Sequence, residues 1–143
     1  MNIPVMNRTK SFGRSWLLCA WLGAAWTFAA SAGTNEVPRL GVEEFAKKVA
    51  DQHNLVLDVR TPKEFAAGHI PGAVNQDVLA DGFKGAVEKL ERSRTYLVHC
   101  ASGRRSQQAC QQMQALGFTN LFELRDGFVG WQKAGKPVEK PRQ

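Results

Sequence analysis

The stretch with the clearest chemical character runs from Tyr96 to Ser106 and contains a cysteine, a glycine and two adjacent arginines. A short apolar run ends at Cys100, small residues follow, and residues 106–116 have helical apolar spacing. A strand, a tight loop and a helix would place Cys100 beside a helix N-terminus. Unpaired backbone N–H groups and the helix dipole favour an anion there, and so favour a thiolate over a thiol. Because the thiolate is the nucleophilic form, this stretch predicts a nucleophilic cysteine.

The two arginines of this stretch complete a site for an anion. Arg104 and Arg105 add fixed positive charge and forked hydrogen-bond donors that suit a tetrahedral oxyanion. We therefore interpret the stretch as a nucleophilic cysteine in an anion cradle. A zinc site is not expected, because the chain has no paired-cysteine metal spacing and its histidines are scattered: His53, His69 and His99.

Length and composition are those of one globular domain. The chain has 143 residues, enough to build a hydrophobic core, of which 43% are hydrophobic and 22% charged. The net charge is +6, but residues 1–32 contribute three basic residues and no acidic one. Residues 33–143 therefore hold 16 basic and 13 acidic residues, a net charge of +3. This small and scattered excess does not indicate a nucleic-acid-binding protein.

Residues 1–32 have the pattern of a secretory signal peptide. Basic residues precede an apolar stretch over residues 16–30, and Ala30-Ser31-Ala32 fits a small-x-small cleavage site before Gly33. The alternative is an uncleaved membrane anchor, since a stretch of this length could span a thinned bilayer. We expect a mature domain over residues 33–143 in the periplasm, with membrane contact only through the signal segment if it is uncleaved. Disulfides persist in such a compartment.

Cys110 is the second cysteine of the expected mature domain. If residues 106–116 form one helix, Ala109, Met113 and Leu116 make its inward stripe and Cys110 lies beside them. We interpret Cys110 as a packed, inert thiol. A resolving cysteine that pairs with Cys100 is the alternative.

The elements around the cysteine loop alternate between strands and helices. Expected strands are residues 37–40, 55–59, a short segment ending at 75, 95–99 and 120–124; expected helices are residues 41–49, one beginning at 62, 83–92, 106–116 and 127–134. Thr61 can cap the second helix, with Pro62 at its first position and Glu64 completing a capping box. This alternation predicts an α/β fold with a mainly parallel sheet, in which ligands bind at the carboxyl ends of the strands. Cys100 follows a strand directly, at that edge.

Several ordered motifs resemble those of the rhodanese (thiosulfate sulfurtransferase) family in its single-domain, exported form. The matching residues are Leu57-Asp58-Val59-Arg60 with Glu64-Phe65, Gly68-His69-Ile70-Pro71-Gly72-Ala73-Val74-Asn75, the Cys100 loop, and Leu124-Arg125-Asp126-Gly127-Phe128 with Trp131, Gly135, Pro137 and Val138. The resemblance covers residues 37–138 and implies a single rhodanese-like domain with a mainly parallel five-stranded sheet flanked by helices. One position departs from the family pattern, because Asp126 stands where the first of two glycines is usual. Asp126 could pair with a nearby arginine.

The resemblance implies a thiosulfate sulfurtransferase that works through Cys100. The Cys100 thiolate would attack the outer sulfur of thiosulfate, form a persulfide and release sulfite, and a thiophilic acceptor such as cyanide would then take the sulfur. The family's anion-binding loop corresponds here to Ala101, Ser102, Gly103, Arg104 and Arg105, whose backbone N–H groups would hold the thiosulfate oxygens. No metal or organic cofactor is implied. The implied partners are a small-molecule sulfur donor, thiosulfate, and a thiophilic acceptor; the sequence does not identify partner proteins.

Two other functions are compatible with a reactive cysteine in this loop. One is a persulfide carrier that receives sulfur from a partner and passes it on without turning over thiosulfate. The other is a cysteine phosphatase or arsenate reductase, whose loop has five residues between the cysteine and the arginine. Only four residues separate Cys100 from Arg105, and the smaller cradle disfavours a phosphoryl group on the attacking sulfur.

Three further polar or aromatic residues are expected to be structural. Asp58 ends a buried strand and is expected to position loops through hydrogen bonds. His69 lies in a turn, where a hydrogen-bonding role is expected rather than proton donation. Trp131 is expected to pack in the core near the loop.

Overall fold

The structure is a computed structural model that describes residues 36–140 of the chain. The predicted signal peptide over residues 1–32 lies outside the described residues. None of the helices within residues 36–140 is both long enough and apolar enough to cross a membrane.

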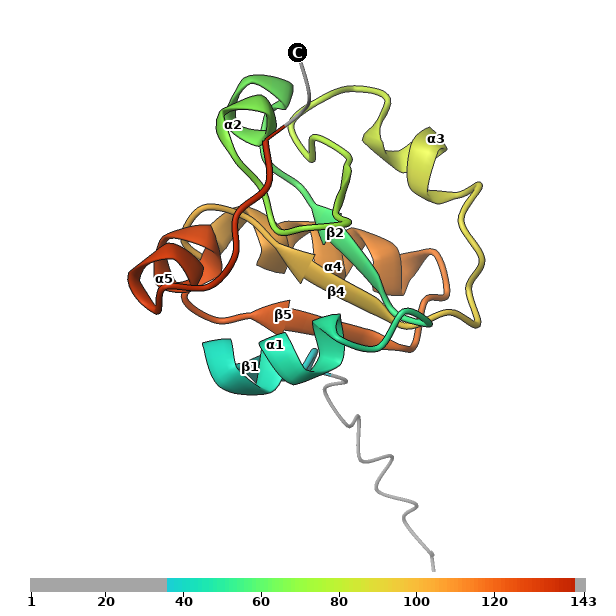
Figure 1. Cartoon of the computed structure of the whole chain (residues 1–143). Coiled ribbons are helices and arrows are strands. Elements are labelled where there is room, and N and C mark those ends of the chain that lie inside the picture. The colour runs from blue at the N-terminus through green and yellow to red at the C-terminus, as the bar shows by residue number, and fades with distance from the viewer. Residues whose placement is uncertain (1–35, 141–143) are drawn as a thin grey trace, which may run out of the picture. The chain divides into compact units, whose positions relative to one another are not determined.

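Strands and helices alternate along the described residues (Figure 1). The elements are β1 (Arg39–Leu40), α1 (Val42–Val49), β2 (Leu55–Asp58), α2 (Pro62–Ala67), β3 (Val74–Asn75), α3 (Phe83–Val87), β4 (Tyr96–His99), α4 (Arg104–Ala115), β5 (Leu121–Leu124) and α5 (Gly127–Lys133). The strands form one five-stranded sheet in the order β1-β5-β4-β2-β3, and every pairing is parallel. The predicted α/β fold with a parallel five-stranded sheet is therefore confirmed.

The core lies on both faces of the sheet. Along β4, Val98 belongs to a cluster with Met113 of α4, whereas the adjacent Leu97 belongs to a second cluster with Phe45 of α1 and Trp131 of α5. Successive strand side chains point to opposite faces, so one strand contributes to both clusters. All four residues of β4 are buried, as expected for a central parallel strand with helices on both faces. Because β4 is the middle strand, Cys100, the residue after it, lies at the centre of the carboxyl edge of the sheet.

Two helix boundaries differ from the predicted ones by two residues or more. The helix expected over residues 83–92 ends at Val87, because Lys89 and Leu90 donate to carbonyls three residues back, the tighter hydrogen bonding of a turn. The helix expected from residue 106 begins two residues earlier, at Arg104. Gly103 precedes it with a left-handed φ of 92°, which redirects the chain into the helix. Both loop arginines therefore belong to the first turn of α4.

Candidate active site

The loop that carries Cys100 is held by the start of α5. The Phe128 N–H donates to the Cys100 carbonyl at 2.7 Å, and the Val129 N–H donates to the Ala101 carbonyl at 3.0 Å. Gly127 permits this approach: a Cβ there would lie 2.5 Å from the Ala101 carbonyl carbon and oxygen, and its φ is +58°. Asp126 has an ordinary φ of −95°, so the turn forms without a glycine at that position. The last helix thus fixes the backbone of the cysteine loop.

Gly103 places a backbone donor against the cysteine sulfur. Its N–H donates to Cys100 Sγ at 3.1 Å. A Cβ on Gly103 would lie 2.6 Å from the Arg125 carbonyl oxygen, and the left-handed φ independently favours glycine. The glycine therefore has two roles: it lets the loop pack against the backbone of residue 125, and it places an N–H donor against the sulfur.

The surroundings of Cys100 favour its ionised form. The side chain is 1% exposed, and burial alone raises the pKa of its thiol. Hydrogen bonds from the backbone and hydroxyl of Ser106, and from the backbones of Ser102 and Gly103, outweigh burial and lower the pKa of Cys100. These donors lie in the loop and the first turn of α4, which is the environment predicted for a thiolate nucleophile. The catalytic role of Cys100 itself stays a prediction.

The two predicted anion-binding arginines are placed differently. Arg104 is exposed and, with Ser102, Arg105 and Gln108, lines a shallow pocket of about 330 Å³. The Arg105 guanidinium instead donates to both carboxylate oxygens of Glu64, at 2.8 and 2.7 Å. The structure therefore brings Ser102, Arg104 and Arg105 together, but it gives Arg105 a partner within the chain.

Glu64 links Arg105 of α4 to the start of α2. The hydrogen bond from Arg105 is the largest cause that lowers the pKa of Glu64 to about 2. Glu64 also accepts from the backbone N–H and the hydroxyl of Thr61, at 3.0 and 2.9 Å, and the predicted capping box is confirmed. One carboxylate thus caps a helix and binds a guanidinium from α4, and only the first of these roles was predicted.

Ala101 lines a second hollow on the other part of the loop. This pocket, of about 260 Å³, is lined by residues of α2, α5 and the loops between: Arg60, Glu64, Ala67, Gly68, Ala101, Phe128, Val129 and Gln132. It combines apolar side chains with a guanidinium and a carboxylate. The cysteine loop therefore contributes to two hollows, one polar and one mixed.

Asp58 has the structural role predicted for it. It is fully buried, and Arg60 binds both of its carboxylate oxygens through Nε and Nη2, with the shortest contact at 2.6 Å. Arg60 also donates to the Gly68 carbonyl at 2.8 Å and lies 4.0 Å from the centre of the Phe128 ring. This buried pair ties the loop after β2 to the turn after α2 and to α5.

His99 precedes Cys100, and its surroundings favour the neutral imidazole. It is fully buried, and burial is the largest cause that lowers its pKa to about 4. Its Nε2 lies 3.6 Å from Asp58 Oδ2, and its Nδ1 lies 3.4 Å from the Cys100 carbonyl oxygen. His99 therefore contacts backbone and Asp58 and supplies no positive charge to the thiolate.

The structural roles predicted for two other residues are confirmed. His69 Nδ1 lies 3.0 Å from the Phe65 carbonyl oxygen, and the two rings stack with centroids 3.8 Å apart. Trp131 is buried in the core, and its indole N–H donates to the Pro137 carbonyl at 2.8 Å.

Cys110 is packed as predicted. It is buried in one cluster with Ala109 and Met113, and the partly buried Leu116 packs against that cluster. Burial raises the pKa of the Cys110 thiol, opposite to the direction found at Cys100. The structure records both cysteines as free, so within residues 36–140 the packed thiol, rather than a disulfide, is observed.

Sequence reasoning missed Ser106 and Glu123. Ser106 is fully buried, and its Oγ lies 3.6 Å from Cys100 Sγ and 2.8 Å from Glu123 Oε1. Glu123 is 1% exposed and forms an ion pair with Arg39 at 3.3 Å. The available signal was a carboxylate in the apolar run of a central strand, since glutamate is almost never fully buried without a partner.

Comparison with known proteins agrees with this geometry. Residues 41–134 match the Rhodanese-like domain family. A sulfurtransferase of Allochromatium vinosum is 30% identical over 106 residues, which cover 73% of this chain and 97% of that protein. Thiosulfate sulfurtransferase 16, chloroplastic, of Arabidopsis thaliana is 33% identical over 93 residues, covering 58% of this chain and 78% of the relative.

A solved structure has the same fold. The crystal structure of a rhodanese-related protein from Thermoplasma volcanium is 28% identical in sequence, with a TM-score of 0.65, and the match covers 73% of this chain and 99% of that one. The family match spans more than half of the chain, and the parallel sheet with a cysteine loop after β4 agrees with it. The chain therefore belongs to the rhodanese-like domain family.

Proposed function

We propose that this protein is a sulfurtransferase that carries sulfur as a persulfide on Cys100, with thiosulfate as donor and cyanide or a thiol as acceptor. The observation that carries the proposal is the buried Cys100 Sγ, which accepts a hydrogen bond from the Gly103 N–H at the start of α4. The relatives named sulfurtransferase and thiosulfate sulfurtransferase support the same chemistry. The signal-peptide pattern of residues 1–32 supports a periplasmic location as part of this proposal.

The reaction divides into two displacements at sulfur. The Cys100 thiolate attacks the outer sulfur of thiosulfate, a new sulfur–sulfur bond forms, and the old one breaks as sulfite leaves with the electron pair. The acceptor then attacks the outer sulfur of the persulfide, and the Cys100 thiolate is restored. Sulfite is stable without a proton, so the step needs no general acid. The neutral state of His99 is compatible with this requirement.

The loop supplies donors where negative charge must be held. Backbone N–H groups from Ala101 to Arg105 would bind the thiosulfate oxygens and later the persulfide anion. The Gly103 N–H already faces Cys100 Sγ, so this donor needs no rearrangement. Arg104 is exposed at the polar pocket, where it would attract the dianion from solvent.

Mass spectrometry of the mature protein after treatment with thiosulfate tests the proposal. We expect an added mass of one sulfur atom on the Cys100 peptide and none on the Cys110 peptide. Thiocyanate formation with cyanide then distinguishes an enzyme from a carrier, since a carrier would be loaded without turnover. Hydrolysis of an aryl phosphate that depends on Cys100, with no persulfide formed, would contradict sulfur transfer.

Glu64→Gln is expected to strengthen thiosulfate binding. The substitution removes the negative charge beside the loop and one of the two acceptors of the Arg105 guanidinium, whose hydrogen bonds to Glu64 are 2.7 and 2.8 Å long, so Arg105 is held less tightly. We expect the KM for thiosulfate to fall by about fivefold, equivalent to about 1 kcal/mol, the upper range for a partly exposed ion pair. Steady-state kinetics measure it, with the exposed Glu88→Gln as the matched control. A higher KM would mean that Glu64 instead holds Arg105 in its binding position.

A further inference from the structure

A buried carboxylate contacts the same serine that contacts the nucleophile. Glu123 Oε1 in β5 lies 2.8 Å from Ser106 Oγ. The Ser106 hydroxyl also lies 3.6 Å from Cys100 Sγ and 3.1 Å from the Gly103 carbonyl oxygen. A serine hydroxyl has one proton, so it can donate to only one of these three acceptors at a time. The Ser106 hydroxyl therefore donates to Glu123, to Cys100 or to the loop backbone, but not to more than one of them.

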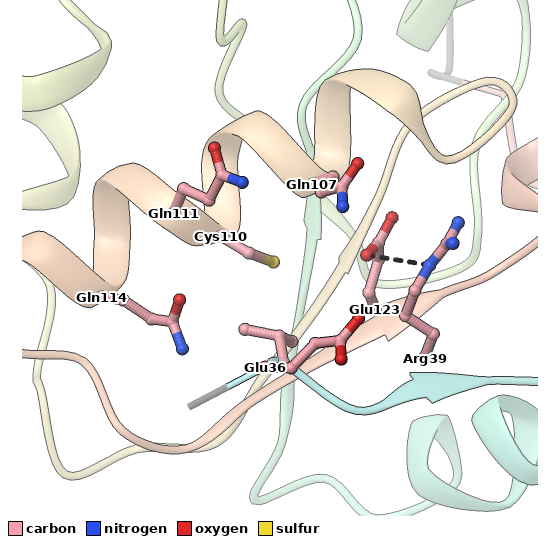
Figure 2. A pocket seen from close by; sticks show the side chains of 8 residues that line it. Glu36, Arg39, Gln107, Cys110, Gln111, Gln114 and Glu123 are labelled. Carbon is pink, nitrogen blue, oxygen red and sulfur yellow. Dashed lines mark ion pairs between the residues drawn. The ribbon is translucent and has the colours of Figure 1, made fainter. Parts of the chain in front are cut away.

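Glu123 reaches solvent through a pocket on the side of α4 that faces β1 and β5. This pocket of about 410 Å³ has side chains of α4 over the strands that carry Glu123 and Arg39 (Figure 2). Arg39 is 40% exposed, and its Nε lies 3.3 Å from Glu123 Oε2. The charged, titratable and hydroxyl groups near Glu123 are Arg39 from β1, Ser106 and Cys110 from α4, Cys100 beyond Ser106, and Glu36 in the pocket lining. A proton can reach the buried carboxylate through this pocket.

We propose that Glu123 sets the charge state of Cys100 through the Ser106 hydroxyl. When Glu123 is ionised, its carboxylate is the strongest acceptor, and the Ser106 hydroxyl donates its hydrogen bond to it. The Ser106 oxygen then accepts from Cys100, which is held as the thiol. When Glu123 is protonated, its O–H donates to Ser106 Oγ, and the serine proton turns to the Cys100 thiolate. The thiol proton passes to Ser106 as the serine proton passes to Glu123. Protons balance, and one negative charge is shared by two buried groups.

The pKa shifts of Glu123 and Cys100 have the directions expected if the two groups share one proton. Burial is the largest cause that raises the pKa of Glu123, and the Ser106 and Arg39 interactions oppose it only in part. The pKa of Cys100 is lowered, against its burial, with Ser106 the first of the groups that lower it. The two pKa values move toward each other, as one proton shared through Ser106 requires, and groups coupled in this way would titrate as a pair.

This arrangement makes Glu123 a positioning residue, and the inference rests on the proposed nucleophilic role of Cys100. It also removes an electrostatic conflict. A dianionic donor that approaches a thiolate would otherwise meet a second fixed negative charge behind Ser106. With the proton on Glu123, the site holds a single negative charge, on the sulfur that reacts.

The rate of Cys100 alkylation by iodoacetamide, followed against pH, tests the inference. Mass spectrometry of the Cys100 peptide separates this reaction from any at Cys110. In Glu123→Gln the carboxamide donates to Ser106 as a protonated Glu123 would, at every pH. We therefore expect the midpoint of the Cys100 titration to fall by about one pH unit. In the Ser106→Ala background, the same substitution should move the midpoint by less than half of that shift.

Glu36→Gln is the matched control, since Glu36 lines the same pocket but is exposed. It should leave the midpoint unchanged. If Glu123→Gln shifts the midpoint equally with and without Ser106, Glu123 acts only by charge repulsion and not through the serine. If it does not shift the midpoint at all, Glu123 has no influence on Cys100. Either result overturns the inference. If Glu123→Gln does not fold, Glu123→Asp keeps the charge but withdraws it from Ser106, and an unchanged midpoint there overturns it too. Alkylation needs no sulfur transfer, so failure to form a persulfide from thiosulfate would count against the proposed function alone.

Discussion

Cys100→Ser is expected to lower sulfur transfer from thiosulfate to cyanide by about four orders of magnitude or more. A serine hydroxyl stays protonated in the loop that stabilises the Cys100 thiolate, and it cannot form a persulfide. The donors around Sγ, including the Gly103 N–H at 3.1 Å, remain but then have no anion to stabilise. The measurement is kcat/KM for thiocyanate formation by the purified mature protein.

Cys110→Ala is the matched control for that experiment. Cys110 is buried in the core and burial raises its thiol pKa, so its removal should leave activity within about twofold while costing about 1 kcal/mol of stability. The assignment of the nucleophile would be wrong if the Cys110 variant lost activity and the Cys100 variant kept it. Loss of activity in both, with both proteins folded, would point to a role for the pair.

Arg60→Ala is expected to lower the free energy of unfolding by about 3–5 kcal/mol. Asp58 is fully buried, and Arg60, which is 4% exposed, is the cation that binds both of its oxygens. Without Arg60 the carboxylate is left buried and unpaired, and the Gly68 carbonyl loses its donor. Urea unfolding followed by circular dichroism measures the change.

Two further variants show whether the unpaired charge is the cause. Arg125→Ala breaks the exposed pair with Asp126, whose side chains are 58% and 52% exposed, and should cost less than about 1 kcal/mol. Adding Asp58→Asn to Arg60→Ala removes the buried charge and should recover part of the lost stability. A loss below about 1 kcal/mol in Arg60→Ala would mean that water reaches Asp58 and replaces the guanidinium.

The features that could be predicted from the sequence depend only on residues that are close together along the chain. Apolar runs such as residues 55–57 and 96–98 predict central strands because both of their faces must be buried. Thr61, Pro62 and Glu64 predict a helix start because the capping groups are three residues apart. The position of Cys100 at the carboxyl edge follows from the strand before it. These predictions needed no knowledge of which segments meet.

The partners of the site residues depend on segments that are distant along the chain. Arg105 meets Glu64 across 41 residues, and Ser106 meets Glu123 across 17. Neither contact leaves a local pattern, because each is set by how α4 packs against other elements. The start of α4 at Arg104 depends on a left-handed Gly103, a conformation that a glycine permits but does not require. Long-range pairing and a permitted backbone conformation were therefore the parts that sequence could not decide.

The hydrogen bonds from α5 to the cysteine loop have a consequence for the order of events during synthesis. The Cys100 and Ala101 carbonyls are held by amides of residues 128 and 129, which leave the ribosome some thirty residues after the cysteine does. Until that final helix docks, the Cys100 and Ala101 carbonyls lack these two donors, and the loop is held only by its own contacts and those of α4. We therefore expect Cys100 to gain the reactivity of a stabilised thiolate only after the last helix has docked, and to stay less reactive in the nascent chain.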